Sequence, residues 1–590
     1  MSSSSPSMAH PTYFQSIFAS FFLIALSTLF IPITLLLTLL AFLYSSLKGT
    51  ALDAQKPPEG IIRKTVLITG ARTNKALCLA RSFKRAKYRV ILAEEKESGT
   101  LCCARFSRAA DAYYDLPKVQ GEADNQAYID AIKALVIAED IDAWIPCSGG
   151  RTTTLDAETA RHIHEMHLGD GPGNCCDTFI QHPDLAATLH FKDQLGFLLN
   201  ELECPTPESR RVTSIAQAAD FLHAPHTLDS GKKYLLKGVA LHDLGQDFTL
   251  LPLATRQDTL AHLRKMPIPI SHETPFLLQR FLKGREYCTH VAARQGEITA
   301  FVACRSSDFL MRYVDITTLG EVEKECSDEI EDWVKGFLKK WKEKLEAENQ
   351  GDNQKGQWET ELTGHFSFDF IKDDIEGILY PLECNVRANT AVVLLSETPT
   401  LADSYLLGLS DRNRQPPLSR PPPNARPRSW ITHALPLSLI QTFLRLPFIR
   451  FISPSFWVLI HPGLLLLLPS PSPIPPKQHR ATNGNAAPLD PPRDPDPTLS
   501  PSPTDNPFSA LIKFLFGTFL SASFLASVDA RFSRRPFLIS IEQDPYWDWD
   551  DPVPFFVLAH VTWVWMFMRL ALTGRGWSRV NVSTGEVFEC

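Results

Sequence analysis

The residues with the clearest chemical potential lie in the segment GHFSFDFIKDDIEGILYPLECNVRAN, which runs from Gly364 to Asn389. Phenylalanines alternate with polar residues at its start, which predicts a strand with one face on a core. That alternation comprises Phe366, Phe368 and Phe370 against His365, Ser367 and Asp369. The sequence Asp-Asp-Ile-Glu-Gly follows and is typical of a turn. The segment therefore predicts a hairpin of two strands.

Three side chains of this hairpin could bind a metal ion. Glu383 and Asn385 lie two residues apart and so share a face of the second strand, where Asp369 can join them. Carboxylate and amide oxygens are the hard ligands that Mg²⁺ takes alongside nucleotide phosphates. Arg387 follows directly and could serve as a fixed cation for a phosphoryl group. The alternative is the polar outer face of an ordinary hairpin.

Length and composition narrow the class of protein. At 590 residues the chain has room for two or three domains. The net charge is −7 and there is no basic cluster, so we do not expect nucleic-acid binding. The 12 cysteines show no two-by-two metal spacing and suggest reduced thiols.

The N-terminal region, residues 1–56, reads as a membrane anchor. No charged residue occurs from Pro11 to Leu47, which exceeds the ~20 apolar residues that a helix needs to cross hydrocarbon. Four basic residues follow: Lys48, Lys56, Arg63 and Lys64. By the positive-inside rule, the chain after Lys48 faces the cytosol. A buried hairpin of two core helices is the alternative.

The next region alternates between strand and helix patterns, which predicts a parallel α/β sheet. Strands are expected at Lys64–Gly70, Arg89–Glu95 and Asp142–Gly150, with a helix over Ala71–Tyr88. Ser148, Gly149 and Gly150 would lie beyond a strand's carboxyl end, where open α/β sheets bind ligands, although a plain turn fits equally well.

Further along, Lys192 precedes a helical segment and Lys237 lies in the expected strand KYLLKG. Strands are expected between Pro275 and Cys304. Taken alone, both lysines are also compatible with solvated surface charges. A long amphipathic helix before the hairpin carries a core stripe of Ile330, Trp333, Phe337, Trp341 and Leu345.

In this order, these segments resemble the ATP-grasp superfamily of carboxylate–amine ligases. The resemblance implies an α/β pre-ATP-grasp domain over 61–180 and an α+β ATP-grasp domain over 183–407, acting with ATP and Mg²⁺ (or Mn²⁺). It further implies that phosphates are bound by Lys192 and Lys237, adenine is bordered by Gln279, Arg280, Phe281 and Leu282, and the ribose is held by Glu286. The metal would be bound by Asp369, Glu383 and Asn385, with Arg387 and Lys237 as catalytic residues.

Shorter motifs look like the cyanobacterial mycosporine-glycine synthase branch and related fungal secondary-metabolite enzymes. The motifs are Thr73–Phe83, Gly284–His290, Ser306-Ser307, the run from Glu383 to Arg387, and Asp550–Phe555. This resemblance implies a ligase that joins a small acid or enol to an amino-acid amine, with substrate contacts from His290, Arg305, Ser306 and Ser307. A hydrogen-bonded core histidine remains open for His290. A ligase for amino-acid or alkaloid precursors (fumisoquin type) and a nucleotide-binding membrane scaffold without chemistry are the rival functions.

The C-terminal third is uneven. Residues 411–507 read as a Pro-rich, partly disordered linker with apolar segments. Residues 508–590 contain the apolar stretches Phe508–Val528 and Pro552–Met568, the second rich in aromatic residues. We expect this region to be membrane-associated or packed on the enzyme, with interfacial packing favoured over two further crossings.

Overall fold

The computed structural model describes residues 13–49, 52, 63–96, 101–167, 176–239, 247–306, 313–349, 356–406, 418–423, 425–428, 544–575, 577–581 and 586–589. All of these residues belong to one compact unit. Ser307, most of the Pro-rich stretch and Phe508–Val528 lie outside the described residues. The domain limits at 61–180 and 183–407 stay predictions.

A parallel sheet of five strands follows the N-terminal helix, in the order β3-β2-β1-β4-β5. The strands are β1 (Thr65–Thr69), β2 (Arg89–Glu95), β3 (Ala112–Leu116), β4 (Ala143–Pro146) and β5 (Asp177–Thr178). The connecting helices include α2 (Asn74–Arg85), α4 (Asn125–Ala138) and α5 (Thr153–His167). Every residue of β1 is buried, as expected for a strand covered on both faces. The predicted α/β alternation is confirmed.

The second sheet is antiparallel, with the order β6-β9-β7-β8. Its strands are β6 (Ser209–Val212), β7 (Tyr234–Gly238), β8 (Asp247–Leu251) and β9 (Phe276–Arg280). The helices α8 (Ile215–Leu222), α9 (Pro225–Asp229) and α10 (Arg256–Leu263) accompany it. Tyr234, Leu236 and Leu278 face a small core, so Lys237 and Gln279 point to the opposite face.

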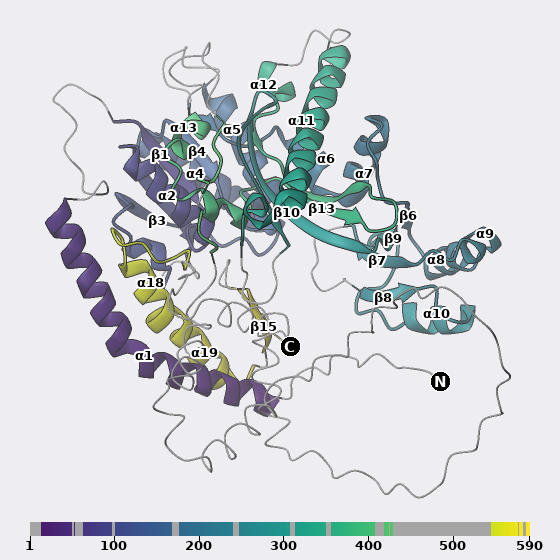
Figure 1. The fold of residues 1–590 in the computed structure, drawn as a ribbon, viewed down its shortest axis with the longest axis horizontal. Coiled ribbons are helices and arrows are strands. Elements are labelled where there is room, and N and C mark those ends of the chain that lie inside the picture. The colour runs from purple at the N-terminus through teal and green to yellow at the C-terminus, as the bar shows by residue number, and fades with distance from the viewer. Residues whose placement is uncertain are drawn as a thin grey trace, which may run out of the picture. The chain divides into compact units, whose positions relative to one another are not determined.

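The third sheet contains the predicted hairpin and has the order β11-β10-β13-β14, with β12 beside β10. Its strands are β10 (Gly284–Arg294), β11 (Glu297–Arg305), β12 (Gly364–His365), β13 (Ser367–Asp373) and β14 (Leu379–Asn385). Helix α11 (Glu321–Asn349) lies along one face (Figure 1). Its Trp333 ring packs edge-on to Phe368 and Phe370, with centroids 5.1 and 5.0 Å away. The three hairpin phenylalanines are fully buried, as predicted.

Short elements join these sheets. Helices α6 (Pro183–His190) and α7 (Lys192–Glu201) pack on β14. After β14 come η6 (Thr390–Leu395) and α13 (Leu401–Leu406), which pack on α2. The remaining short helices are η1 (Cys103–Phe106), η2 (Glu122–Asp124), η3 (Gly150–Thr152), η5 (Ile316–Leu319) and α12 (Gln357–Thr360).

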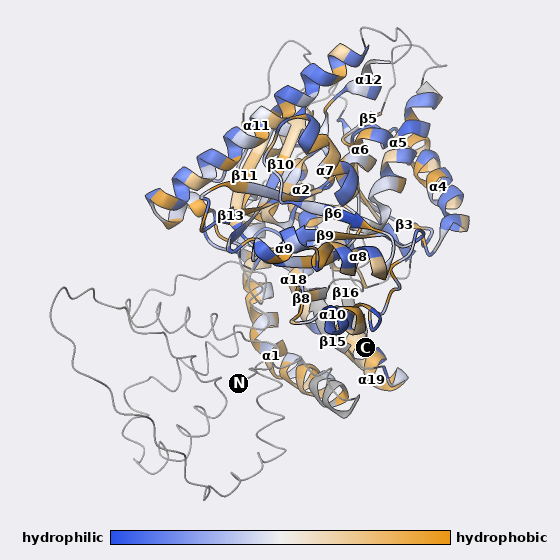
Figure 2. Ribbon diagram, turned by 90° about the vertical axis from the view of Figure 1, so that its right-hand side faces the viewer, coloured by the Kyte–Doolittle hydropathy of each residue, from blue (hydrophilic) through white to orange (hydrophobic). Residues whose placement is uncertain are grey.

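Two apolar helices from the ends of the chain lie side by side (Figure 1). Helix α1 spans Tyr13–Lys48, and the C-terminal helix runs through α18 (Val553–Val557), the π-helical η9 (Leu558–Thr562) and α19 (Trp563–Thr573). Figure 2 colours much of α1 and α19 as hydrophobic. A two-stranded sheet, β15 (Trp577–Asn581) and β16 (Glu586–Glu589), follows.

Candidate functional site

One face of the third sheet gathers the predicted oxygen ligands. Asp369 pairs directly with Glu383 across the hairpin and with Cys288 of β10 on its other side. Asn385 lies two residues beyond Glu383, and its Nδ2 is 3.4 Å from Asp369 Oδ2 and 3.5 Å from Glu383 Oε1. The opposite face carries the phenylalanine core. The hairpin therefore presents its polar residues away from α11 because strand side chains alternate between faces.

Two lysines approach this face from other elements. Lys192, at the start of α7, makes an ion pair of 3.2 Å with Glu383 Oε2. Lys237, on β7, donates to Gln279 Oε1 at 2.6 Å. Burial lowers the pKa of Lys237, and the nearby positive charge of Lys192 lowers it further. The structure thus brings both predicted lysines to the carboxylate face, Lys192 from helix α7 and Lys237 from the second sheet.

The carboxylates fit a divalent cation by their chemistry. Asp369 Oδ1 is buried without a hydrogen-bond partner. Burial and the adjacent Glu383 carboxylate raise the pKa of Asp369. For Glu383, burial opposes ionisation, but Lys192 and the hydrogen bond with Asp369 hold its pKa below the usual value. Two carboxylates that share one proton are a natural site for a metal ion, which would ionise both.

The donor set is small. Among the described residues, no three His, Cys, Asp or Glu side chains gather to hold a metal, so the candidate set is two carboxylates and one amide. Asn385 turns its amide nitrogen toward the carboxylates, and metal binding would use its Oδ1 instead. Phosphate oxygens and water would complete such a coordination shell.

The expected adenine segment leaves β9 and enters β10. The Arg280 side chain is occupied by an ion pair of 2.7 Å with Glu376 in the hairpin turn. Phe281 is 41% exposed, whereas Leu282 is buried with Ile371. A segment held to the hairpin turn at one end and exposing an aromatic ring at its centre could border a planar base.

The residue expected to hold the ribose, Glu286, lies on β10. It is two residues before Cys288 and therefore on the face of Asp369. Its carboxylate is exposed, and its charge acts on Lys237.

Arg387 connects the carboxylate face to the α/β sheet. A Cβ placed on Gly150 would lie 3.1 Å from Arg387 Nη1, so the loop after β4 passes directly against this guanidinium. Gly70, at the end of β1, has φ +76, and a Cβ there would meet Ser148 N at 2.6 Å. Only glycine fits that position, which lets the loops after β1 and β4 touch. The predicted ligand-binding edge of the sheet thus lies beside Arg387.

Sequence reasoning missed a buried charged residue at this edge, Lys75. Its side chain is 5% exposed, and Nζ donates to Ser148 O across 3.4 Å. Burial lowers its pKa to about 7, and the positive charge of Arg387 contributes. The preceding residue, Asn74, is fully buried with both side-chain polar atoms unpaired. The signal in the sequence that could have identified Lys75 is a buried strand that ends in Gly70 and is followed closely by Thr73-Asn74-Lys75.

The structure corrects two of the predicted substrate contacts. His290 is fully buried, accepts from Asn389 N at 3.3 Å and lies 3.2 Å from the Tyr405 hydroxyl. Burial lowers its pKa to about 3, so it is a neutral, hydrogen-bonded core histidine. Arg305 pairs with Tyr287, on the α11 face, and binds Glu323 there. It therefore points away from the carboxylates.

The other two predicted substrate contacts are Ser306 and Ser307. Ser306 donates its backbone N–H to Glu286 O at 3.0 Å. Ser307 lies outside the described residues.

A separate cavity of about 480 Å³ lies where residues 545–550 cross α2 and the turn after η6. Its lining includes Arg81, Arg85, Arg428, Trp547 and Asp548. The arginines are already paired with carboxylates, Arg85 with Asp548 and Arg428 with Glu397 at 3.0 Å. We therefore assign the chemistry to the carboxylate face rather than to this cavity.

Comparison with known proteins gives distant structural similarities only. No protein-family model matches the chain, and no curated protein matches it. The ADP complex of an N5-carboxyaminoimidazole ribonucleotide synthetase is 12% identical, with 65% of this chain and 86% of that chain covered and a TM-score of 0.44. Biotin carboxylase from Campylobacter jejuni is 14% identical, with 60% and 72% covered and a TM-score of 0.43.

An L-amino acid ligase from Bacillus licheniformis is also 14% identical, with 60% of this chain and 77% of that chain covered and a TM-score of 0.39. These TM-scores are low. We therefore draw the chemistry of the site from its own residues rather than from these structures.

Proposed function

We propose that this protein is an ATP-dependent ligase of the ATP-grasp type, which phosphorylates a small carboxylate or enol and joins it to an amino-acid amine. The observation that carries the proposal is the convergence of Lys192 and Lys237 on Asp369, Glu383 and Asn385. Two cations facing a paired carboxylate site suit a nucleotide triphosphate with its metal ion.

The residues have separable tasks. Lys192 and Lys237 bind phosphate oxygens, the segment from Gln279 to Leu282 borders the base, and Glu286 binds the ribose. Mg²⁺ held by Asp369, Glu383 and Asn385 would neutralise charge that develops on the phosphates. The transferred phosphoryl group replaces hydroxide as the leaving group, and the amine then displaces phosphate to form the C–N bond.

The acceptor acid belongs at the edge of the α/β sheet. Arg387 supplies a positive charge there, Lys75 supplies a second one when it is protonated, and the unpaired Asn74 side chain supplies a donor and an acceptor. Arg387, between this edge and the carboxylate face, contacts the phosphoryl group during transfer. An activated acid held beside the buried Lys75 would be shielded from water, which would otherwise hydrolyse it.

The finer assignment follows the sequence resemblance. We place the reaction in secondary metabolism of the mycosporine-like kind, with a ligase for amino-acid or alkaloid precursors as the second candidate. Gene neighbourhood distinguishes the two candidates: finding a dehydroquinate-like cyclase and a methyltransferase would support the first, and finding a peptide-synthetase-like neighbour would support the second. Helix α1 anchors the enzyme in a membrane with the catalytic part on the cytosolic side, in line with its exposed apolar surface and the basic residues after Leu47.

The test is amino-acid-dependent ADP release by the full chain in detergent, screened against a library of acids. We expect turnover with one class of acid and its loss in Glu383→Ala. If wild type and Glu383→Ala both bind ATP and neither turns over any acceptor, the protein is a nucleotide-binding scaffold and the proposal is wrong.

A further inference from the structure

Helix α1 has an inverted pattern of burial, whereas the C-terminal helix buries large residues such as Trp563 and Phe567 on its inner side. Within the described side chains of α1, every buried residue is small or carries a hydroxyl: Ser20, Thr34, Thr38, Ala41 and Ser45. The large residues point outward instead, with Leu29 70%, Leu36 57% and Leu47 80% exposed. A helix of a water-soluble protein buries its large residues, whereas membrane helices pack through small and hydroxyl residues and turn their leucines to lipid.

Two hydroxyl residues of α1, Ser27 and Thr34, contact the C-terminal helix. Ser27 Oγ donates to Ala559 O at 2.9 Å and lies 2.9 Å from His560 Nδ1. Thr34 Oγ1 lies 2.6 Å from His560 Nε2. Both ring nitrogens of His560 are therefore used by α1. The π-helical turn of η9 carries this histidine, so a local widening of the helix coincides with the polar contact.

The C-terminal helix has its own apolar outer face. It has 21 residues, from Val553 to Thr573, and is apolar enough over 18 of them to cross a membrane. Trp565 is 56% and Leu572 78% exposed, and Val561 and Met568 lie on the same outward side. Its inner side meets the catalytic body, where Thr562 Oγ1 donates to Leu101 O at 2.6 Å. One side of the helix therefore packs on the protein, and none of the described residues covers the apolar face on the other side.

The end of α1 next to the catalytic body has the residues of a membrane interface. The Tyr44 and Trp549 rings meet edge-on at 6.3 Å, and the Lys48 ammonium lies 5.6 Å from the Tyr44 ring. Arg108 bonds to Ser45 and lies 5.5 Å from the Phe42 ring. Aromatic and basic side chains gather in this way at the level of lipid headgroups.

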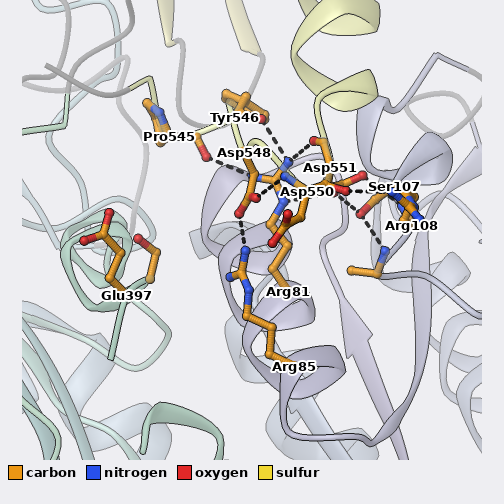
Figure 3. A network of polar contacts seen from close by, with 12 residues as sticks. Arg81, Arg85, Ser107, Arg108, Glu397, Pro545, Tyr546, Asp548, Asp550 and Asp551 are labelled. Atoms are coloured by element: carbon orange, nitrogen blue, oxygen red, sulfur yellow. Dashed lines mark hydrogen bonds and ion pairs between the residues drawn. The ribbon is translucent and has the colours of Figure 1, made fainter. Parts of the chain in front are cut away.

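A buried ion pair fastens the C-terminal helix to the α/β sheet (Figure 3). Asp551 is fully buried, and its Oδ2 receives Arg81 Nε at 2.9 Å and Ser107 Oγ at 2.5 Å. Arg81 also donates to the carbonyls of Tyr546 and Asp551, at 2.9 and 2.8 Å. These buried hydrogen bonds fix the direction in which the C-terminal helix leaves the body.

We propose that α1 and the C-terminal helix form one membrane-embedded pair, with the outer face of Val553–Thr573 in contact with the same phospholipid bilayer as α1. The polar contacts at His560 hold the pair together, and the Arg81–Asp551 junction seats the catalytic body on the bilayer surface. The C-terminal helix is thus a second membrane element and not a soluble cover. This inference is independent of the ligase chemistry.

The experiment is carbene labelling of the full wild-type chain in phosphatidylcholine nanodiscs, using a lipid-soluble diazirine and peptide mass spectrometry. We expect adducts on α1 and also on Val561, Trp565, Met568 and Leu572. Exposed hydrophobic residues of the body serve as internal controls and stay unlabelled: Ile137, Phe197 and Phe248. Adducts on α1 alone, or on neither helix, overturn the proposal, since another protein surface then covers the C-terminal helix.

A variant separates the contact between the helices from lipid binding. Ser27→Leu with Thr34→Leu raises the hydrophobicity of α1 while removing both partners of His560. We expect α1 to keep its adducts and trypsin to cut faster after Arg569, by at least tenfold. Leu36→Ala, on the outer face, is the matched control and leaves the cleavage rate unchanged. An unchanged rate in the double variant shows that the polar contacts do not hold the pair.

Discussion

Replacing Lys75 by methionine should make the protein more stable and its acceptor binding weaker. The pKa of Lys75 falls from its usual 10.5 to about 7 because the side chain is buried and lies near the positive charge of Arg387. Each pKa unit corresponds to ~1.36 kcal/mol, so keeping this lysine in the fold at neutral pH costs about 4 to 5 kcal/mol. Methionine fills a similar volume without a charge, and we expect it to recover about half of that cost or more.

The stability difference between wild type and Lys75→Met should depend on pH. Between about pH 7 and 10.5 the unfolded chain binds a proton that the folded chain does not, so wild-type stability rises with pH in this window. The advantage of Lys75→Met is therefore largest below pH 7 and disappears towards pH 10.5. Urea midpoints of both proteins from pH 6 to 10 measure it.

Although Lys75→Met should stabilise the fold, it should weaken binding of the acid. A hydrogen bond to a charged group contributes about 1.5–3 kcal/mol, which corresponds to a rise of about 10- to 150-fold in the KM for the acid. The KM for ATP should stay unchanged. Lys84→Met is the control, since Lys84 is buried in the same helix but pairs with Asp111 at 2.6 Å, and its loss should destabilise. If Lys75→Met destabilises at pH 6 and leaves the KM for the acid unchanged, Lys75 is a structural residue and the reasoning fails.

Three further substitutions test other parts of the structure. Lys237→Met should lower kcat about 10²–10³-fold in the ADP-release assay, since it removes a preorganised cation; a change in the KM for the acid alone would contradict this role. Gly150→Ala should displace Arg387 and lower kcat, while calorimetry shows unchanged ATP binding. Gly149→Ala, with open space around its Cβ, should leave kcat unchanged. Equal effects of the two substitutions would show that the loop does not act through Arg387. Asp551→Ala should lower the free energy of unfolding, measured by urea denaturation, by about 3–5 kcal/mol, because it leaves the buried Arg81 without its carboxylate partner. A loss under about 1 kcal/mol would mean that the ion pair contributes no more than about one ordinary hydrogen bond.

Local patterns in the sequence were sufficient to predict the hairpin. The alternation around Phe368 and the spacing of Glu383 and Asn385 have the period of a strand. Which residues of one strand share a face follows from that strand's sequence alone. The buried runs of the α/β sheet are equally local, although the short strand β3 (Ala112–Leu116) was not predicted. Its pattern, AYYDL, is only half-buried at the sheet edge and so has little hydrophobic signal.

What the sequence did not reveal depends on pairing between distant strands. The face of Arg305 is set by its pairing with Tyr287 and cannot be read from either strand alone. Lys75 becomes part of a site only because β1 and β4 are neighbours, which places its ammonium next to Ser148. The contact of Ser27 with His560 joins residues 533 positions apart. Such contacts follow from topology, which a single strand or helix does not encode.

The meeting of Lys75 and Arg387 leads to a final prediction about protons. Burial disfavours the charged form of Lys75 and the neighbouring Arg387 repels it, so Lys75 loses its proton at about pH 7. An acid bound between them would supply the missing negative charge and raise the pKa of Lys75 again. At pH 8 acceptor binding should therefore take up close to one proton, whereas at pH 6 the lysine is already charged and uptake should be near zero.

Calorimetry of acceptor binding in buffers of different ionisation enthalpy measures this uptake, and Lys75→Met should abolish it. Binding at pH 8 with no dependence on the buffer would show that the acid does not reach Lys75. The acceptor would then bind on the carboxylate face alone, beside Arg387, and the edge of the α/β sheet would serve only to support it.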